Sequence, residues 1–318
     1  MTKENQKIML SGVKPTGRPH IGNYFGAMRQ FVELQNDYHT YIMLADLHAL
    51  TTVKDAKQLK RDTLDLAIDY LAIGLDPNKV TLFKQSDVPE HSELAWIFDC
   101  ITTMPYLMRA HAYKDAEAKN KELDAGTFTY PMLMAADILL YDTDVVPVGK
   151  DQQQHVEYAR DTAEKFNRLF GETFKLPKAM ILEAVETVPG LDGQKMSKSY
   201  GNTIPLFAED AEIKKLVMSI VTDSAGGRPE NVYQIHKLFK PVAELDKLYA
   251  EKEGKYQALK EALIEDAIAF ITPLRERRAA IAAKPDEVIT ILGNGAGEAR
   301  EQAKLKMAKV RQAVGLDL

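Results

Sequence analysis

Short apolar runs alternate with segments of helical periodicity through the first half of the chain. Four runs are each long enough for one buried strand, at 7–12, 38–44, 80–83 and 145–148. Apolar residues recur with helical spacing between these runs, most clearly at 24–36, 59–72 and 152–170. Because strands and helices alternate, the pattern predicts an α/β fold built on a doubly wound parallel sheet.

Turn and cap residues mark the ends of several of these helices. Asp55, with Gln58 three positions later, resembles a capping box, and Gly74 is placed to end the helix that follows. Pro131 suits the first turn of a helix that opens near Thr127. The whole stretch from about 88 to 140 has helical rather than strand spacing.

Strand signals vanish after Pro205, and the rest of the chain is predicted to be helical. The expected helices span 213–221, 230–239, 242–271, 273–283 and 287–314. At 318 residues the chain is long enough for about two domains. We therefore expect a sheet domain at 1–205, with a helical insertion at about 88–140, and an all-helical domain at 206–318.

Composition and charge narrow the class of protein. Hydrophobic residues make up 45% of the chain and charged residues 27%, which is ordinary for a protein with a buried core. No stretch approaches the roughly 18 apolar residues of a membrane span, and the N-terminus does not resemble a signal peptide. The cytoplasm is therefore the expected location, with no membrane partner.

The single cysteine excludes some kinds of site, and the net charge argues against one class of protein. Cys100 rules out an internal disulfide and a cysteine-based zinc site, and its apolar neighbours predict a buried thiol. A net charge of −5 argues against a general nucleic-acid binder, although a local basic patch would suffice for one RNA ligand. The stretch 275–311 holds nine Lys or Arg against five Asp or Glu, which composition alone explains as a solvated helix face.

Candidate chemistry begins at the turn after the first strand. The run Lys14-Pro15-Thr16-Gly17-Arg18-Pro19-His20-Ile21-Gly22-Asn23 joins that strand to a helix. Such a turn aims backbone N–H groups and a positive helix end at a phosphate. Gly22 allows a close backbone approach, and His20 and Asn23 lie one turn apart, so both can reach one anion.

A second candidate element is the loop at 188–201. It contains three glycines, one proline and the run Lys195-Met196-Ser197-Lys198-Ser199. Two lysines on a mobile loop can close over phosphates, the serines add donors, and Met196 is expected to pack.

Polar residues also follow other predicted strands. His48 comes soon after the second strand, and Gly149, Lys150 and Asp151 come directly after the fourth. Ligands of open α/β sheets bind at these carboxyl ends, although His48 has an alternative role as a structural, hydrogen-bonded histidine.

Both motifs resemble those of a known family. His20-Ile21-Gly22-Asn23 resembles the HIGH motif of class I aminoacyl-tRNA synthetases, and Lys195–Ser199 matches their KMSKS motif, in the required order. The resemblance implies a Rossmann-like fold, catalytic roles for His20, Asn23, Lys195 and Lys198, and ATP with Mg²⁺ bound through the nucleotide phosphates. ATP contacts are then expected from Lys14, Pro15, Thr16, Gly22, Asn23, Gly149, Lys150, Asp151, Val188, Lys195, Met196, Ser197, Lys198 and Ser199. It also suggests Lys114 as a phosphate contact in a charged segment that otherwise indicates a solvated surface.

The residues around Asp137 indicate which amino acid such an enzyme would use. Tyrosyl enzymes carry a Gln between the Tyr and the Asp of their recognition helix, whereas here Met134 stands between Tyr130 and Asp137. Methionine suits a broad indole face, and Asp137 can accept its N–H. These positions resemble bacterial tryptophanyl-tRNA synthetases. The implied tryptophan site comprises Leu10, His48, Tyr130, Met134, Asp137, Val146, Val148 and Gln152. Lys14, Thr16 and His20 depart from the residues common in that subgroup.

The resemblance further implies L-tryptophan, ATP and tRNA(Trp) as partners. It implies a homodimer formed by the apolar part of 95–107, and an anticodon-binding role for 206–318. Arg275, Arg277 and Arg278 are then expected to contact tRNA phosphates.

Three alternatives are weighed against this interpretation. One is a tyrosine-specific enzyme, one is a nucleotidyltransferase with the same motif but no tRNA, and one is an inactive regulatory relative. The roughly 110 residues after Pro205 count against the second, and the presence of both motifs counts against the third.

Overall fold

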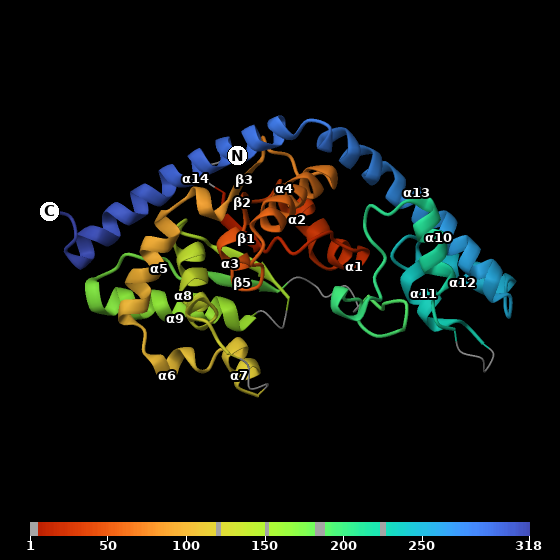
Figure 1. Ribbon diagram of the computed structural model, residues 1–318, viewed down its shortest axis with the longest axis horizontal. Coiled ribbons are helices and arrows are strands. Elements are labelled where there is room, and N and C mark those ends of the chain that lie inside the picture. The colour runs from red at the N-terminus through yellow and green to blue at the C-terminus, as the bar shows by residue number, and fades with distance from the viewer. Residues whose placement is uncertain (1–5, 119–121, 150–152, 182–187, 223–226) are drawn as a thin grey trace.

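The computed structural model describes residues 6–118, 122–149, 153–181, 188–222 and 227–318 (Figure 1). Lys150, Asp151 and Gln152, which the sequence assigned to ligand binding, lie outside these ranges.

Five parallel strands form the central sheet in the order β3-β2-β1-β4-β5. Their bounds are β1 Ile8–Val13, β2 His39–Leu44, β3 Val80–Lys84, β4 Val145–Val148 and β5 Lys178–Ile181. The predicted doubly wound α/β sheet is confirmed, with β5 as a fifth strand that the sequence pattern missed. Strand order reverses between β1 and β4, and at such a point the carboxyl ends of the strands leave a crevice for a ligand.

Helices cover both faces of the sheet and continue beyond it. Those of the first half are α1 Ile21–Asn23, α2 Arg29–Leu34, α3 Asp46–Ala49, α4 Ala56–Ala72, α5 Glu90–Ile101, α6 Met104–Leu107, α7 His111–Ala118, α8 Ala125–Leu139 and α9 Gln153–Phe170. Those of the second half are α10 Asp210–Met218, α11 Glu230–His236, α12 Val242–Glu251, α13 Tyr256–Ala282 and α14 Pro285–Val314. A π-helical segment, Tyr24–Met28, joins α1 to α2, and short 3-10 helices lie at Gln85–Asp87 and Lys198–Tyr200.

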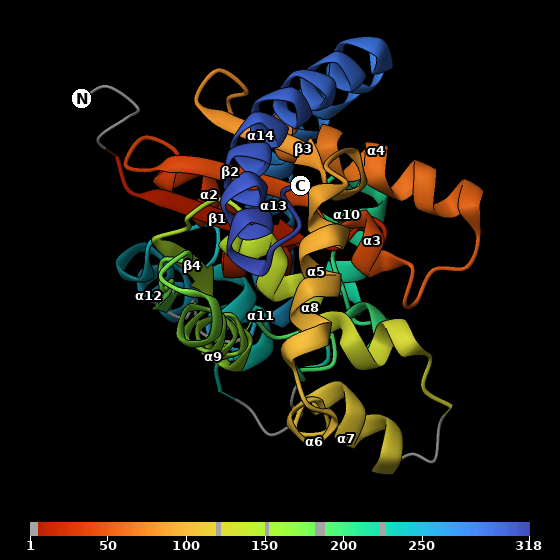
Figure 2. The same ribbon diagram turned by 90° about the vertical axis from the view of Figure 1, so that its left-hand side faces the viewer.

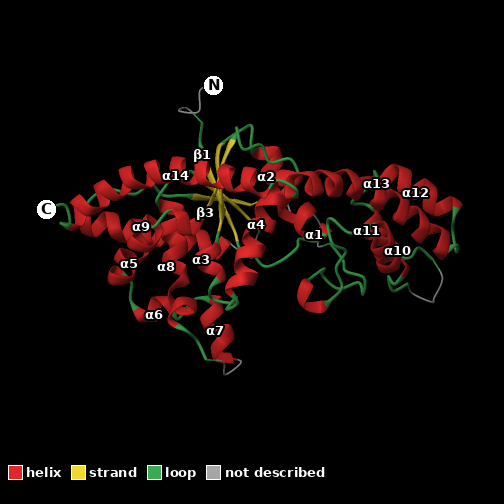
Figure 3. Ribbon diagram, turned by 45° about the horizontal axis from the view of Figure 1, so that its top comes forward, coloured by secondary structure: helices red, strands yellow, loops and turns green. Residues whose placement is uncertain are grey.

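Alternate residues of the strands pack into two separate hydrophobic cores. Ile42 and Leu44 of β2 join the core that α2 and α4 share with α10–α13, whereas Tyr41 and Met43 point to the core under α5, α8 and α9. This is the two-residue period of a strand that is buried on both faces. The helices α10–α13 lie to one side of the strands, and the sheet sits near the middle of the molecule (Figure 3).

The predicted start and end of α4 are confirmed. Asp55 accepts from the backbone N–H groups of Lys57 and Gln58 at 2.8 and 3.1 Å, which satisfies two donors at the helix start. Gly74 follows the helix with φ +109°, a conformation that favours glycine.

Three local expectations are wrong. Asp124 caps α8, so Pro131 lies inside the helix rather than in its first turn, and Pro273 lies inside α13 rather than between two helices. The chain breaks instead between α12 and α13, where Gly254 has φ +75°. Cys100 is exposed because it falls on the outer face of α5, one turn from the exposed Trp96.

The last helix returns over the sheet domain. α14 packs against β3, α4 and α5, and it runs along one edge of the molecule from the C-terminal helices back to α5 (Figures 1 and 2). An added Cβ at Gly295 would lie 2.0 Å from Leu82 O, so this glycine lets the helix contact the strand backbone. The domain boundary at 205 stays a prediction. Within the described ranges, no helix is long and apolar enough to cross a membrane.

Candidate active site

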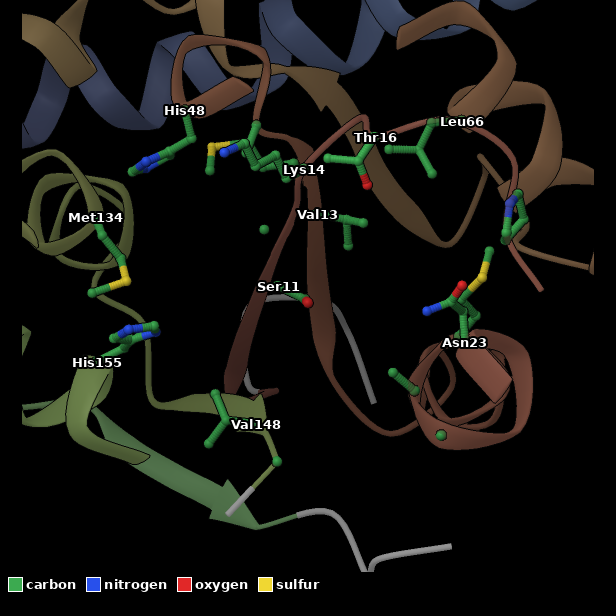
Figure 4. Close-up of a pocket in the computed structure, with 18 of the residues that line it drawn as sticks. Ser11, Val13, Lys14, Thr16, Asn23, His48, Leu66, Met134, Val148 and His155 are labelled. Carbon is green, nitrogen blue, oxygen red and sulfur yellow. The ribbon is translucent and has the colours of Figure 1, made fainter. Parts of the chain in front are cut away.

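A cavity of about 1450 Å³ opens at the carboxyl ends of β1 and β4 (Figure 4). It brings together most of the residues that the sequence assigned to ligands. Those that line it are Leu10, Lys14, Thr16, His20, Gly22, Asn23, His48, Tyr130, Met134, Asp137, Val146, Val148, Gly149, Val188, Lys195, Met196, Ser197 and Lys198. Pro15, Ser199 and the exposed Lys114 are not among the lining residues.

His20 and Asn23 cap the first helix reciprocally. His20 Nδ1 accepts from the Asn23 backbone N–H at 3.3 Å, and Asn23 Oδ1 accepts from the His20 N–H at 3.1 Å. Because Nδ1 is an acceptor, the neutral ring carries its proton on Nε2. Burial, together with the charge of Lys198, lowers the pKa of His20 to about 4, so the ring is neutral at pH 7. The cap thus leaves an N–H donor and the Asn23 amide group for an anion.

Gly22 is the close-packed residue of this helix start. A Cβ there would lie 2.9 Å from His20 Nδ1 and 3.4 Å from Met196 Sδ. Met196 is buried, as predicted, and joins the core that contains α2 and α4. The two motifs, far apart in sequence, therefore pack against each other across Gly22.

Lys198 rests on the first turn. Its Nζ donates to Thr16 O and Gly17 O, both at 2.9 Å. Burial lowers the pKa of Lys198, while the carboxylates of Asp62 and Asp69 act in the opposite direction. The lysine is therefore held beside the helix start that carries His20.

Asn202 organises the loop around this lysine, and the sequence interpretation missed it. Its Oδ1 accepts from Ser197 N–H at 2.8 Å, and its Nδ2 donates to Asp192 Oδ1 at 2.7 Å and to Lys195 O at 3.2 Å. The side chain is buried, so these bonds fix the backbone of the loop. An Asn directly after Gly201 is ordinary turn composition, which is why it gave no signal.

The opposite end of the cavity contains a buried carboxylate. Asp137 accepts from His48 Nε2 at 2.8 Å and from Gln85 Nε2 at 2.7 Å, and His91 Nδ1 lies 2.7 Å from its Oδ1. Burial alone would raise the pKa of Asp137, but the hydrogen bond from His48 and the electrostatic effect of His91 bring it down to about 2. The carboxylate is thus ionised. Gln85 and His91 were not predicted, although Gln85 directly follows a strand.

Apolar side chains surround this carboxylate. Tyr130, Met134 and Asp137 occur at positions i, i+4 and i+7 of α8, so they share the face that lines the cavity. Leu10 and Val146 are buried on the strands opposite. Such a slot can hold a planar apolar group and accept one hydrogen bond from it.

Lys14 lies between the two ends of the cavity. Its Nζ donates to Thr51 Oγ1 at 3.0 Å, and burial lowers its pKa. Figure 4 shows it between His48, on the side of the apolar slot, and Thr16, on the side of the helix start. A cation here can meet a carboxylate or a phosphate that bridges the two halves.

The three arginines expected to contact tRNA phosphates are bonded within the fold. Arg275 donates to Ala208 O at 2.6 Å, and Arg277 donates to Ala72 O at 3.0 Å. Arg278 pairs with carboxylates of α4. These side chains join helices to one another, and the tRNA contact that the resemblance implies for them stays a prediction.

The chain is similar to known proteins in both sequence and structure. A family model described as "tRNA synthetases class I (W and Y)" matches residues 2–274. The chain is 47% identical to the tryptophan–tRNA ligase of Rhodopirellula baltica over 97% of its own length and 99% of that protein. It is also 47% identical to that of Fusobacterium nucleatum, over 98% of both chains. A crystal structure of tryptophanyl-tRNA synthetase from Campylobacter jejuni, complexed with ADP and tryptophan, superposes with a TM-score of 0.91 at 44% identity and covers 97% of this chain and 100% of that one.

Proposed function

The chain belongs to the class I tRNA synthetases of the tryptophan and tyrosine family, and from this membership we infer that it activates L-tryptophan with ATP and transfers it to tRNA(Trp). The observation that carries the amino-acid assignment is the ionised, buried Asp137 inside an apolar slot that faces the phosphate-binding helix start. The near-full-length identity to tryptophan–tRNA ligases supports it. The tyrosine alternative lacks comparable support, because Met134 offers no polar group to a phenol.

The first step joins the tryptophan carboxylate to the α-phosphate of ATP and releases pyrophosphate. The chain contributes position and charge rather than a covalent intermediate. His20 Nε2–H and the Asn23 amide donate to phosphate oxygens at the helix start, while Lys195 and Lys198 place positive charge over the departing pyrophosphate. Lys14 orients the carboxylate and the phosphate that react.

Magnesium enters this scheme with the nucleotide. Among the described residues, no three His, Cys, Asp or Glu side chains are grouped to hold a metal ion. We propose that Mg²⁺ would be held by the phosphates of ATP, where it would offset negative charge on the departing group.

The second step moves tryptophan to the 3′ end of tRNA(Trp). We assign anticodon binding to the helices after residue 205, and we propose that two chains form a homodimer in the cytoplasm. The dimer proposal is supported by the exposed apolar residues of α5 and α6, which include Trp96 and Met104 at 69% and 58% exposure.

The experiment that tests this function is ATP–pyrophosphate exchange with each of the twenty amino acids. Exchange should require tryptophan, and purified tRNA should then accept labelled tryptophan. Exchange with tyrosine instead would move the assignment to the tyrosine branch of the family. Exchange without charging of tRNA would favour the nucleotidyltransferase alternative.

A further inference from the structure

A histidine ring lies behind the Asp137 carboxylate, and it is not among the residues that line the cavity. His91 is fully buried in the first turn of α5, and its Nδ1 lies 2.7 Å from Asp137 Oδ1. α5 packs along α8, the helix that carries Asp137 (Figure 2). The other ring nitrogen, Nε2, lies 2.8 Å from the hydroxyl of Tyr141, which is also fully buried. The ring therefore meets one polar group at each of its two nitrogens.

Tyr141 is held by the end of α8 and by its aromatic neighbours. It comes four residues after Asp137, and the next residue, Asp142, has φ +53°, a left-handed conformation that commonly follows a helix end. Its ring stacks on that of Tyr41 with the centres 4.8 Å apart and meets the ring of Phe83 edge-on at 5.8 Å. Burial, together with the charge of Asp137, raises the pKa of the Tyr141 hydroxyl well above its usual value. The hydroxyl therefore keeps its proton and stays a hydrogen-bond donor.

The hydrogen bonds around the His91 ring run in one direction. Asp137 is ionised, so the proton between the carboxylate and the ring belongs to Nδ1. In the neutral ring Nε2 is then an acceptor, and the Tyr141 O–H donates to it. A ring turned over about its Cβ–Cγ bond would present carbon atoms at both positions and would lose both contacts. The hydroxyl thus opposes the flipped ring and the other tautomer alike.

The orientation of His91 matters because it decides how many donors hold the Asp137 carboxylate. A carboxylate offers about four lone-pair positions. His48 Nε2, Gln85 Nε2 and His91 Nδ1 approach three of them, at 2.8, 2.7 and 2.7 Å. One position remains for a donor on the ligand. If the His91 ring turned over, the carboxylate would lose one of its three fixed partners and could rotate away from that ligand.

We propose that Tyr141 is a positioning residue for the recognition of tryptophan, because its hydroxyl holds the His91 ring with Nδ1–H towards Asp137 and so fixes the carboxylate that accepts the indole N–H. This inference rests on the proposed function, which assigns the amino acid through Asp137. Tyr141 itself is not among the lining residues of the cavity. Its effect should therefore appear in the choice of ligand rather than in the phosphate chemistry.

The test is calorimetric titration with tryptophan and with benzothienylalanine, an analogue in which sulfur replaces the indole N–H. Wild type should bind tryptophan more tightly, because only tryptophan can donate to Asp137. Tyr141→Phe should lower this preference about tenfold, as for the loss of one hydrogen bond that leaves a buried partner unpaired. The kcat of ATP–pyrophosphate exchange at saturating tryptophan should stay within about twofold of wild type. A loss of packing alone would weaken both ligands alike and leave the preference unchanged.

Tyr41→Phe is the matched control. It removes the same atom from the ring that stacks on Tyr141, and within the described part of the chain no hydrogen bond joins that hydroxyl to His91 or Asp137. Its preference for tryptophan should equal that of wild type. In a His91→Asn background the amide NH₂ can replace Nδ1–H, but no nitrogen remains at the position of Nε2. Adding Tyr141→Phe there should change the preference by less than about twofold, because the hydroxyl acts only through the ring.

If Tyr141→Phe is too unstable to purify, nitrogen NMR spectra of wild type labelled in its histidine rings decide, with His91→Asn to assign the signal. The His91 ring should carry a proton on Nδ1. A ring without that proton, or equal preferences in wild type and Tyr141→Phe, would overturn the inference. A wild type that prefers tryptophan to the sulfur analogue but exchanges no pyrophosphate would instead reject the proposed function.

Discussion

Asp137 shows how one carboxylate is kept ionised in a buried place. Three side chains on three different elements, His48, Gln85 and His91, offer it nitrogen atoms within 2.8 Å. A buried carboxylate needs such partners, because desolvation alone would neutralise it. The carboxylate is therefore held in place before any ligand arrives, at the wall of the cavity.

We expect Asp137→Asn to fold but to use tryptophan poorly. An amide is a weaker acceptor than a carboxylate, and its NH₂ group would face the donors on His48 and Gln85. The loss in kcat/KM for tryptophan should be on the order of 100-fold, as for removal of one charged hydrogen bond at a recognition site. Exchange kinetics at varied tryptophan measure it. If this variant keeps the wild-type kcat/KM for tryptophan, Asp137 does not take part in recognition.

His20 should make stability depend on pH below neutrality. Its folded pKa of about 4 lies below the ordinary histidine value of 6.5, so the unfolded chain binds the proton more readily. The unfolding free energy therefore falls as pH drops from 6.5 towards 4, by up to about 3 kcal/mol from this residue. His20→Gln should lose this dependence. Denaturant unfolding of wild type and His20→Gln at pH 4.5 and pH 7 measures how much unfolding free energy each protein loses. Equal losses in the two proteins would contradict the role of His20.

At the scale of elements, the lysine loop is shaped by bonds that its motif does not contain. Asn202 fixes the backbone of Ser197 and Lys195, and Met196 anchors the loop in the core. The loop thus combines a fixed base with lysines at its surface. Such an arrangement allows the lysines to bind a negatively charged ligand and to release that ligand afterwards.

Lys198→Ala should lower the rate of tryptophanyl-adenylate formation by about 100-fold or more, as for loss of one transition-state contact. Equilibrium binding of tryptophan should hardly change, because Lys198 lies at the phosphate end of the cavity. Lys214→Ala, an exposed lysine of α10, controls for the lost charge. Single-turnover kinetics and calorimetric titration separate the two effects. Lost tryptophan affinity with an intact activation rate would contradict the assignment.

The sequence predicted those elements whose signals are local. Four strands and the cap at Asp55 followed from apolar runs and turn chemistry. β5 was missed because residues 178–181 are a short edge run with little burial. Pro131 and Pro273 were expected at helix starts, but tertiary packing continues both helices through them. Asn202 bonds to a nearby loop whose path the sequence pattern does not define, so it gave no signal. Gln85 directly follows β3, a position from which it could have been proposed, but its partner Asp137 lies 52 residues away.

The contact between α14 and β3 offers a test at the level of elements. Gly295→Ala would place a Cβ against the Leu82 backbone, and because neither backbone can yield easily, we expect a loss of about 1–3 kcal/mol in unfolding free energy. Gly293→Ala is the control, since an added Cβ there meets nothing within 4 Å. That control should gain up to about 1 kcal/mol from helix propensity. Equal stability of the two variants, measured by urea unfolding, would mean that the helix does not lie against the strand.

For the whole molecule, the return of α14 makes the two halves interdependent. The helix starts beside α4 and α13 and ends in the core under α5 and α9, where Met307 and Val310 are fully buried. The C-terminal residues therefore stabilise the sheet domain directly. The surface outside α5, by contrast, leaves Trp96, Cys100 and Met104 exposed. These exposed apolar side chains support the proposed contact with a second chain.

Trp96→Glu should dissociate the proposed homodimer. In a two-fold symmetric interface the change occurs twice, and burying the unpaired charge should cost several kcal/mol. Sedimentation should show a half-mass species with unchanged helical circular dichroism, and activity should fall, because the tRNA is expected to span both subunits. Ile289→Glu, at an exposed apolar residue of α14, is the control and should sediment as wild type. Since Trp96 is the single tryptophan, its fluorescence in the wild type should also shift on dilution. A wild-type protein that is a fully active monomer at micromolar concentration would rule out the dimer.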